Sequence, residues 1–348
     1  MTPRERILAA IEFTGPDRCP RAHAIFPGVF WKYGQKLLDL MEQYPDDFGN
    51  QTVQVHGSLP PDEGDETSTI VQERDEWGSV SRRLHGYTAG QVLEPAIPSW
   101  EAYKHYEFPR LPADSVFEEF AARVEREHPH NFVSAGGGQM FHLLVSLRGT
   151  ENLFMDLAED NEGLNDLADR LVKRNLYASE KYIKLGADCL SFADDWGMQD
   201  RLLIHPDTWR RFFKPRYKRM MEAARDAGVH VWFHSDGYTM DIFEDLLEIG
   251  VTVLNPQHTI MGTRKVGEML GGRVCVCTDI DRQHVIPFGT PAQVTEAVKE
   301  AIAAFGTCSG GCLLNGEVSP NTPFENIVAL CSAYNEYGQY PLDWLVKA

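Results

Sequence analysis

The feature that most constrains the fold of this chain is an alternation, from about residue 114 onward, of short apolar runs with longer segments of helical period. In each longer segment the apolar residues recur with the 3.6-residue spacing of an amphipathic helix, and an apolar run of strand length follows. The predicted helix and strand pairs are Ser115–Glu127 with Phe132–Ala135, Asn161–Leu185 with Asp188–Ala193, Pro206–Ala227 with His230–Phe233, Met240–Ile249 with Thr252–Leu254, Arg264–Leu270 with Val274–Thr278, and Pro291–Phe305 with Cys312–Leu314. Six such pairs in succession predict an α/β fold whose parallel strands are joined by right-handed crossovers.

The first 112 residues are less regular. Thr2 and Glu5, on either side of Pro3, predict a capping box at the start of a helix that Gly15-Pro16 ends. Short strands are predicted at Ala22–Phe26 and Thr52–Val55, and a hairpin within Gly78–Val92. Because no long polar linker follows, we interpret residues 1–112 as an N-terminal elaboration that includes early barrel elements. Residues 113–348 then supply the regular βα units of one domain spanning 1–348.

Charge and cysteine content restrict the partners and the compartment. A formal net charge of -18 argues against nucleic acid and anionic membranes as partners, because an acidic surface repels phosphate. The seven cysteines contain no CxxC pair, which favours reduced thiols in a cytoplasm. The N-terminus lacks an apolar signal region, and no apolar run approaches the roughly 20 residues that span a bilayer. We therefore expect a cytoplasmic protein outside the membrane, and its oligomeric state is left open.

Polar and metal-binding residue types recur just past the apolar core of one predicted strand after another. In a βα barrel, catalytic groups lie at these carboxyl ends of the strands. The alternative for each residue taken singly is an ordinary loop or helix-capping role, since Asp, Asn and Gly are common in such loops. The series is Gly136–Gly138, Asp194-Asp195, His234-Ser235-Asp236, Asn255–His258, Asp279–Asp281 and Asn315–Glu317. As a set, these residues predict an active site at the strand ends.

Two of these strand ends carry the sharpest signals. His234 and Asp236 can face one cavity, as a metal-binding pair or as a general acid and base, although Asp236 can instead cap the helix expected near Tyr238. Asp194 and Asp195 are adjacent carboxylates, and burying two like charges together is costly. We therefore expect one of them to face the cavity and the other to be solvated or hydrogen-bonded. The sequence does not say which.

The remaining candidates are weaker. Cys277 and Glu317 can complete an open zinc site of the catalytic kind with His234, although a free cysteine is commonly just a small buried hydrophobe, as expected for Cys275. The glycines Gly136–Gly138 lack the context of a phosphate-binding loop. Structural or packing roles are expected for His142, His205, His230, His284, Trp196, Trp209 and Trp232.

Several segments, in order along nearly the whole chain, resemble the uroporphyrinogen decarboxylase superfamily. The matching stretches are Pro3–Arg6 through Pro16–Pro20, Asp194–Gln199 with Pro206 and Phe213–Tyr217, His234–Gly237, Gly250-Val251 to Asn255-Pro256, Asp279–Gln283 with Pro287–Pro291, and Thr322–Asn326. The superfamily includes true decarboxylases and cobamide-dependent methyltransferases. The resemblance implies a (β/α)8 TIM barrel, in agreement with the alternation.

The resemblance also distinguishes between the two branches of the superfamily, the true decarboxylases and the methyltransferases. True decarboxylases carry an N-terminal arginine cluster for substrate carboxylates, whereas the matching segment here, Pro20–Phe26, contains Arg21 alone. The coenzyme M methyltransferases bind zinc through His-x-Cys and a later cysteine. This chain has His234 in the histidine position, Asp236 in place of the first cysteine and Glu317 near the later one. A mixed histidine and carboxylate zinc site makes the ion a harder Lewis acid, suited to an ether or alkoxide oxygen.

The resemblance thus implies a methyltransferase that moves a methyl group between a small substrate, of the methoxylated aromatic or methylamine type, and a corrinoid on a partner protein. The alternatives are a decarboxylase or lyase acting on a small carboxylate through Asp194 and Asp236, and a non-catalytic barrel that binds a corrinoid or tetrapyrrole. The predicted zinc ligands are His234, Cys277 and Glu317, with Asp236 as a further candidate. The predicted catalytic residues are Asp194, Asp195 and Asp236, and the predicted substrate-binding residues are Gln199, Asn255, His258, Asp279 and Arg282.

Overall fold

The computed structural model describes residues 1–49, 70–84 and 90–345. The chain divides into two compact units. The β4–β6 unit comprises Asp65–Glu125 and Ser134–Val251, and the β7–β9 unit comprises Met1–Gly64, Arg126–Val133 and Thr252–Ala348. Each unit is described by itself.

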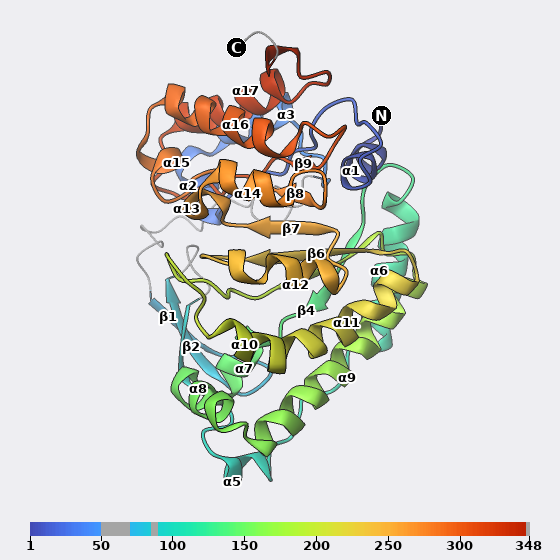
Figure 1. Cartoon of the computed structure of the whole chain (residues 1–348), viewed down its shortest axis with the longest axis vertical. Helices are drawn as coiled ribbons and strands as arrows, with labels where there is room; N and C mark the ends of the chain where they lie inside the picture. Colours follow the sequence, from blue (N-terminus) through green and yellow to red (C-terminus); the bar gives the residue numbers. More distant parts are fainter. Residues whose placement is uncertain (50–69, 85–89, 346–348) are drawn as a thin grey trace. The chain divides into compact units, whose positions relative to one another are not determined.

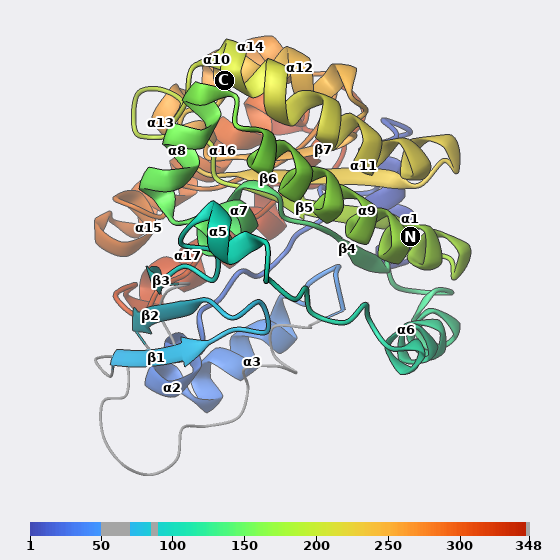
Figure 2. The same ribbon diagram turned by 90° about the horizontal axis from the view of Figure 1, so that it is seen from below.

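Three parallel strands organise the β4–β6 unit. They are β4 (Ser134–Gly138), β5 (Cys189–Ala193) and β6 (His230–Ser235), with β5 paired to both neighbours. Helix α9 (Glu162–Lys184) packs on β4 and α11 (Lys214–Asp226) packs on β6, and the two helices lie side by side (Figures 1 and 2). Because all three strands run in one direction, the residues that follow them emerge at one edge of the sheet.

The other elements of this unit surround the strands. A small antiparallel sheet has the order β1-β2-β3. Its strands and the remaining helices are β1 (Ile70–Arg74), β2 (Val80–Leu84), β3 (Gln91–Glu94), α5 (Trp100–Tyr103), α6 (Asp114–Glu127), α7 (Phe141–Arg148), α8 (Thr150–Glu159), α10 (Pro206–Thr208), the π-helical turn η2 (Trp209–Phe213), η3 (Met240–Ile242) and α12 (Phe243–Glu248).

The β7–β9 unit contains three further parallel strands, β7 (Val253–Pro256), β8 (Cys275–Cys277) and β9 (Cys312–Leu313). Parallel bridges of Arg21 with Leu314 and of Ile25 with Val318 place the segment predicted as strand Ala22–Phe26 beside the chain that leaves β9. The helices of this unit are α1 (Pro3–Ile11), α2 (Pro27–Tyr33), α3 (Gln35–Gln43), α13 (His258–Met261), α14 (Thr263–Leu270), α15 (Val285–Phe288), α16 (Pro291–Phe305), α17 (Phe324–Tyr337) and η4 (Asp343–Leu345).

The predicted α/β architecture is confirmed, because parallel strands alternate with helices in both units. The capping box of α1 is also confirmed: Thr2 accepts from the amide of Glu5, whose side chain accepts from the amide of Thr2. The predicted hairpin is present as the antiparallel pair β2 and β3. The predicted strand Thr52–Val55 lies outside the described residues. No helix in the described part of the chain is both long and apolar enough to cross a bilayer.

Three local predictions are corrected. The helix predicted at Pro206–Ala227 is divided by the π-helical turn, because Pro215 has no amide hydrogen for the helical bond to the carbonyl four residues earlier. The strand predicted at Phe132–Ala135 begins at Ser134 instead. Within the first 112 residues, expected to be less regular, the structure contains α2 and α3, helices of seven and nine residues that are shorter than the span over which helical periodicity is usually recognised.

Candidate functional site

The loops that follow β5 and β6 are bonded to each other through their backbones. The amide of Asp194 donates to the carbonyl of His234 at 3.1 Å, and the amide of Gly197 donates to the carbonyl of Asp236 at 3.0 Å. The amide of Trp196 donates to the hydroxyl of Ser235 at 3.0 Å. These bonds hold the Asp-Asp-Trp-Gly and His-Ser-Asp-Gly segments in register, so their side chains are positioned together.

The glycines of the two segments permit this approach. A Cβ atom on Gly197 would overlap the backbone of Gly237 and Tyr238, and a Cβ atom on Gly237 would overlap the backbone of Gly197. Gly237 also has a φ of +78°, which L-residues with side chains rarely adopt. Both positions therefore require glycine for a steric reason.

Three side chains from these loops converge. The Nε2 atom of His234 lies 3.7 Å from Oδ1 of Asp195 and 3.5 Å from Oδ1 of Asp236. One ligand atom from each of the three residues lies within 4.8 Å of the others, and all three side chains are partly exposed. We call Asp195, His234 and Asp236, with the neighbouring His142, the strand-end cluster. Its nitrogen and oxygen donors are of the kinds that bind divalent transition metals.

Asp195 is held as a carboxylate within this cluster. Its Oδ1 accepts from the amide of Asp236 at 2.9 Å, and its Oδ2 lies 3.2 Å from Nε2 of His142. Burial raises the pKa of Asp195, but hydrogen bonds with His142 and the Asp236 amide and the nearby imidazoles outweigh it and lower this pKa to about 2. Burial lowers the pKa of His142, and contacts with Asp195 and Asp194 outweigh that effect, so the net shift is upward.

Asp194 has a different environment from its neighbour. It is fully buried and accepts from the amides of Met140 and His142 at 2.7 and 2.8 Å and from the hydroxyl of Tyr217 at 2.5 Å. Burial raises the pKa of Asp194, against the opposing effect of these hydrogen bonds. Asp194 therefore anchors the start of α7, and Asp195 is the member of the pair that is partly exposed.

A cavity of about 850 Å³ adjoins the cluster within the β4–β6 unit. Asp195 and His142 both line it. The remaining lining residues come from β3 and the residues that flank it, from the residue after β4, from α7, and from the start of α8 with the glycine before it: Gly90, Gln91, Val92, Leu93, Pro95, Gln139, Val145, Gly149, Thr150, Glu151 and Asn152. This volume is within the usual range of small-molecule sites.

Trp196 and Trp209 pack in the interior, as predicted. Neither is exposed, and the Trp196 ring lies 4.4 Å between centroids from both Phe141 and Phe213. Within Gly136–Gly138, which the sequence did not favour as a phosphate site, the structure shows a steric role for a glycine. A Cβ atom on Gly137 would overlap the Phe192 ring. These glycines allow close packing of the elements that support the site.

The polar residues that follow β8 and β9 form a second group in the β7–β9 unit. The guanidinium of Arg282 lies 3.4 Å from Oδ2 of Asp279 through Nε and 3.1 Å from Oε2 of Glu317 through Nη1. We call Asp279, Arg282 and Glu317 the arginine cluster. Here both carboxylates contact a permanent cation.

The other predicted residues of this unit are buried. Cys277 is 2% exposed, and burial raises the pKa of its thiol well above the ordinary value. Asn255 donates to the carbonyl of Cys277 at 2.9 Å. His258 contacts the Thr263 hydroxyl at 3.0 Å, and burial lowers the pKa of His258 to about 3. Gln199, in the other unit, is exposed.

Of the predicted metal ligands, His234 and the further candidate Asp236 lie together with Asp195 in the β4–β6 unit. Cys277 and Glu317 belong to the β7–β9 unit and have the contacts described above. Their role as ligands stays a prediction. Sequence reasoning assigned His142 a structural role, but it contacts Asp195 and lines the cavity. His142 lies four residues after Gly138, at a strand end where only glycines had been singled out from the sequence. This position was the signal that could have identified His142 as a site residue.

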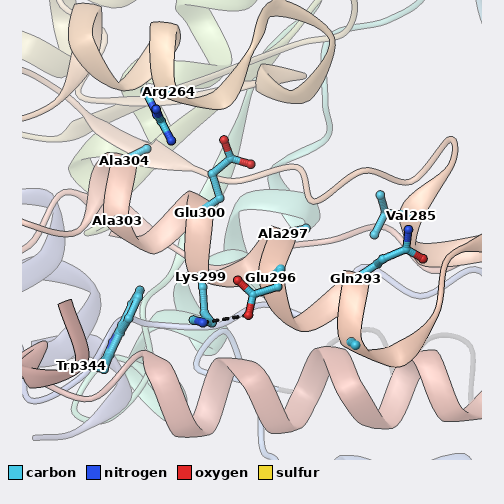
Figure 3. A pocket seen from close by; sticks show the side chains of 11 residues that line it. Arg264, Val285, Gln293, Glu296, Ala297, Lys299, Glu300, Ala303, Ala304 and Trp344 are labelled. Atoms are coloured by element: carbon cyan, nitrogen blue, oxygen red, sulfur yellow. Dashed lines mark hydrogen bonds and ion pairs between the residues drawn. The ribbon is translucent and has the colours of Figure 1, made fainter. Parts of the chain in front are cut away.

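A second cavity, of about 890 Å³, lies in the β7–β9 unit (Figure 3). Residues of α14, α15, α16 and η4 line it, and the ion pair of Lys299 with Glu296, at 2.8 Å, lies at its wall. None of the predicted site residues is among the described residues that line this cavity. Its lining therefore provides no link to the chemistry of the strand ends.

The chain is similar to known proteins of one family. The uroporphyrinogen decarboxylase (URO-D) family model matches residues 96–337. Over 156 residues, the chain is 26% identical to the methylcobamide:CoM methyltransferase MtaA of Methanosarcina barkeri, a match that spans 44% of this chain and 43% of that protein. It is 33% identical over 100 residues, or 28% of each chain, to the uroporphyrinogen decarboxylase of Thermus thermophilus. The chain thus matches less than half the length of these curated relatives.

A solved structure extends the similarity over nearly the whole chain. A methyltransferase from Methanosarcina mazei matches with a TM-score of 0.66 at 17% identity, over 97% of this chain and 99% of that one. At this identity the match shows the fold alone, an α/β fold, as the alternation predicts, of the TIM-barrel type that the family resemblance implies. The family match covers more than half of the chain. The chain therefore belongs to the uroporphyrinogen decarboxylase (URO-D) family.

Proposed function

We propose that this protein transfers a methyl group between a small methylated substrate, a methoxylated aromatic compound or a methylamine, and a corrinoid carried by a separate protein. The family membership and the similarity of part of the chain to a methylcobamide:CoM methyltransferase support an activity of this kind. The observation that carries the proposal is the convergence of Asp195, His234 and Asp236 within 4.8 Å beside a cavity of about 850 Å³.

The strand-end cluster fits a zinc ion. Zinc in catalytic sites takes three protein ligands and leaves a position for substrate or water. Ligand atoms about 2.1 Å from a tetrahedral ion lie roughly 3.4 Å apart, and the His234 nitrogen lies 3.7 and 3.5 Å from the two carboxylate oxygens. Asp195, His234 and Asp236 would therefore hold the ion. When bound, zinc supplies a Lewis acid for the heteroatom that carries the methyl group.

The protein's own residues have separate tasks in this scheme. Oδ1 of Asp195 is the oxygen nearer His234, and its Oδ2 contacts His142, so the imidazole of His142 orients this ligand from its other side. Asp194 fixes the position of His142 through the bond to its amide. Compared with the ligand set expected from the sequence, the proposed set keeps His234 and the further candidate Asp236 and has Asp195 in place of Cys277 and Glu317.

Metal analysis of the purified protein tests this proposal. We expect about one zinc per chain, and a loss of nearly all of it in His234→Ala, because two carboxylates alone bind zinc weakly. His230→Ala is the matched control, since His230 begins the same strand and lies outside the cluster, and should keep its zinc. Incubation with methylcobalamin, monitored by the cobalt absorption spectrum, then tests methyl transfer. Pure, active protein without metal would contradict the zinc site.

Decarboxylation of a small carboxylate is the second candidate, favoured by the similarity to the Thermus thermophilus decarboxylase. Since Asp194 is buried and triply hydrogen-bonded, Asp195 and His142 are better placed than Asp194 to handle a proton in the cavity. In this reaction the metal-free protein would release CO₂ from its substrate and would leave methylcobalamin unchanged. Binding of methylcobalamin without turnover would instead support a corrinoid-binding barrel with no chemistry of its own.

A further inference from the structure

The charge of the cavity beside the strand-end cluster limits what can bind there. Its ionisable lining residues are His142, Glu151 and Asp195, and neither lysine nor arginine is among the described residues that line it. A carboxylate or sulfonate entering this space would face Glu151, while the imidazole of His142 is already paired with Asp195. The charge of a divalent ion on the cluster would be neutralised by Asp195 and Asp236. Anions with such groups in proteins are typically met by arginine or lysine. The lining therefore disfavours an anionic ligand.

The remaining wall is suited to a neutral molecule. Val92, Leu93, Pro95 and Val145 supply an apolar surface. Gln139 and Asn152, with Gln91 and Thr150, supply groups that both donate and accept hydrogen bonds. Apolar side chains with uncharged polar groups among them are suited to uncharged organic ligands that carry hydrogen-bonding groups.

The donor set of the cluster separates neutral ethers from ammonium compounds. A metal ion held by Asp195, His234 and Asp236 can bind a substrate only through a lone pair. A quaternary or protonated ammonium nitrogen has none to offer. Two carboxylates and one imidazole also favour a hard oxygen donor over a soft one.

We infer that the cavity of about 850 Å³ is the substrate site and that it selects an uncharged methyl ether, with Glu151 as the residue that excludes anionic analogues. This inference rests on the proposed function, whose substrate it narrows to an oxygen-linked methyl group. Glu151 acts through its charge alone, because it lies in the first turn of α8 and outside the ligand group.

Direct binding to the protein as purified tests this inference without measuring turnover. The probes are 2-methoxyphenol, its carboxylated analogue 4-hydroxy-3-methoxybenzoate and trimethylammonium, each titrated by calorimetry at neutral pH. The neutral ether should bind at least about tenfold more tightly than the carboxylated analogue, the size of effect expected for one unfavourable charge contact. It should also bind more tightly than trimethylammonium, whose nitrogen offers a metal ion no lone pair. Glu151→Lys should bring the carboxylated analogue to within about threefold of the neutral ether.

Two further variants locate the effect. Glu159→Lys makes the same charge change at the exposed last turn of α8 and should leave the order of the probes unchanged. Val145→Trp, which fills the cavity from α7, should abolish ether binding while the melting temperature and the zinc content stay near the wild-type values.

The outcomes separate the inference from the proposed function. Equal affinity for ether and carboxylate in the wild type, preferential binding of trimethylammonium, absence of ether binding, or equal effects of Glu151→Lys and Glu159→Lys would each overturn the inference. So would unchanged ether binding by Val145→Trp. Ether-selective binding by protein that contains no zinc would support the cavity assignment and contradict the zinc-assisted function.

Discussion

The strand-end cluster and the arginine cluster differ in the nitrogen-containing group that contacts their carboxylates. Both groups follow the carboxyl ends of parallel strands. In the first, Asp195 and Asp236 contact imidazoles, whereas in the second, Asp279 and Glu317 contact the guanidinium of Arg282. A neutral imidazole can bind a metal beside a carboxylate, but a guanidinium cannot lose its charge. Position after a strand thus predicts a polar group, and we expect the partner of that group to decide whether it binds metal.

The largest expected effect concerns the glycines that support the two clusters. Gly237→Ala should lower the free energy of unfolding by about 4 kcal/mol or more, because the new Cβ atom meets backbone at a positive φ. Gly316→Ala, beside Glu317, should cost less, about 1–2 kcal/mol, because its Cβ atom would lie 3.0 Å from side-chain atoms of Ile286 and Tyr334 and 3.2 Å from Cβ of Ile280, without meeting backbone. Urea unfolding of the two variants measures both values. Equal losses would contradict the role given to the contact between the loops.

A second experiment tests directly which cluster binds metal. Asp195→Asn should weaken zinc binding by about 100-fold or more, because a charged ligand is replaced by a neutral one. Glu317→Gln should keep the affinity within about threefold, since Arg282 occupies this carboxylate. Competition with a chromophoric chelator measures both affinities. Loss of zinc in Glu317→Gln would restore the ligand set expected from the sequence.

The arginine cluster should instead show its role in stability. Arg282→Met should cost about 2 kcal/mol in the free energy of unfolding, because it removes the guanidinium from the carboxylate of Asp279, whose side chain is 5% exposed. Arg83→Met, which removes an ion pair with the 57% exposed side chain of Glu73, should cost about 0.5 kcal/mol or less. Thermal unfolding compares the two. An Arg282→Met protein that is fully stable but has lost zinc would show that the two clusters are not distinct in function.

The smallest expected effect concerns His142. His142→Ala should weaken zinc binding by about tenfold, because it removes the group that orients Asp195. His142→Gln should recover part of this loss, since an amide can also donate to the carboxylate. His205→Ala, which removes an exposed helix cap, is the control and should leave zinc binding unchanged. Unaltered zinc affinity in His142→Ala would reduce this residue to part of the cavity wall.

Local patterns in the sequence carried the prediction of the fold and of the two decisive strand ends. The helical period, the capping box at Thr2 and Glu5, and the apolar runs depend on residues a few positions apart, so they can be read without knowing the tertiary structure. The same holds for the placement of Asp194-Asp195 and His234–Asp236 just after strands. The π-helical turn before Pro215 was missed because the apolar period continues through it.

The roles within the site depended on contacts between distant residues. The sequence predicted that one of Asp194 and Asp195 faces the cavity and the other is solvated or hydrogen-bonded, because burying two adjacent charges is costly. The choice between them rests on the amide of His142 and the hydroxyl of Tyr217, 52 and 23 residues away. Likewise, Glu317 has the residue type of a ligand, and only the structure shows that Arg282 contacts it.

The sequence by itself therefore determined the α/β fold, the family resemblance and the strand ends at which Asp195, His234 and Asp236 lie, since these follow from local periodicity and short motifs. Tertiary structure decided that these three side chains converge, that His142 joins them and that a cavity opens beside them. The physical reason is that the three side chains meet only if the backbones of two loops, about 40 residues apart in the sequence, are in contact. Only the close approach of Gly197 to Gly237 allows it.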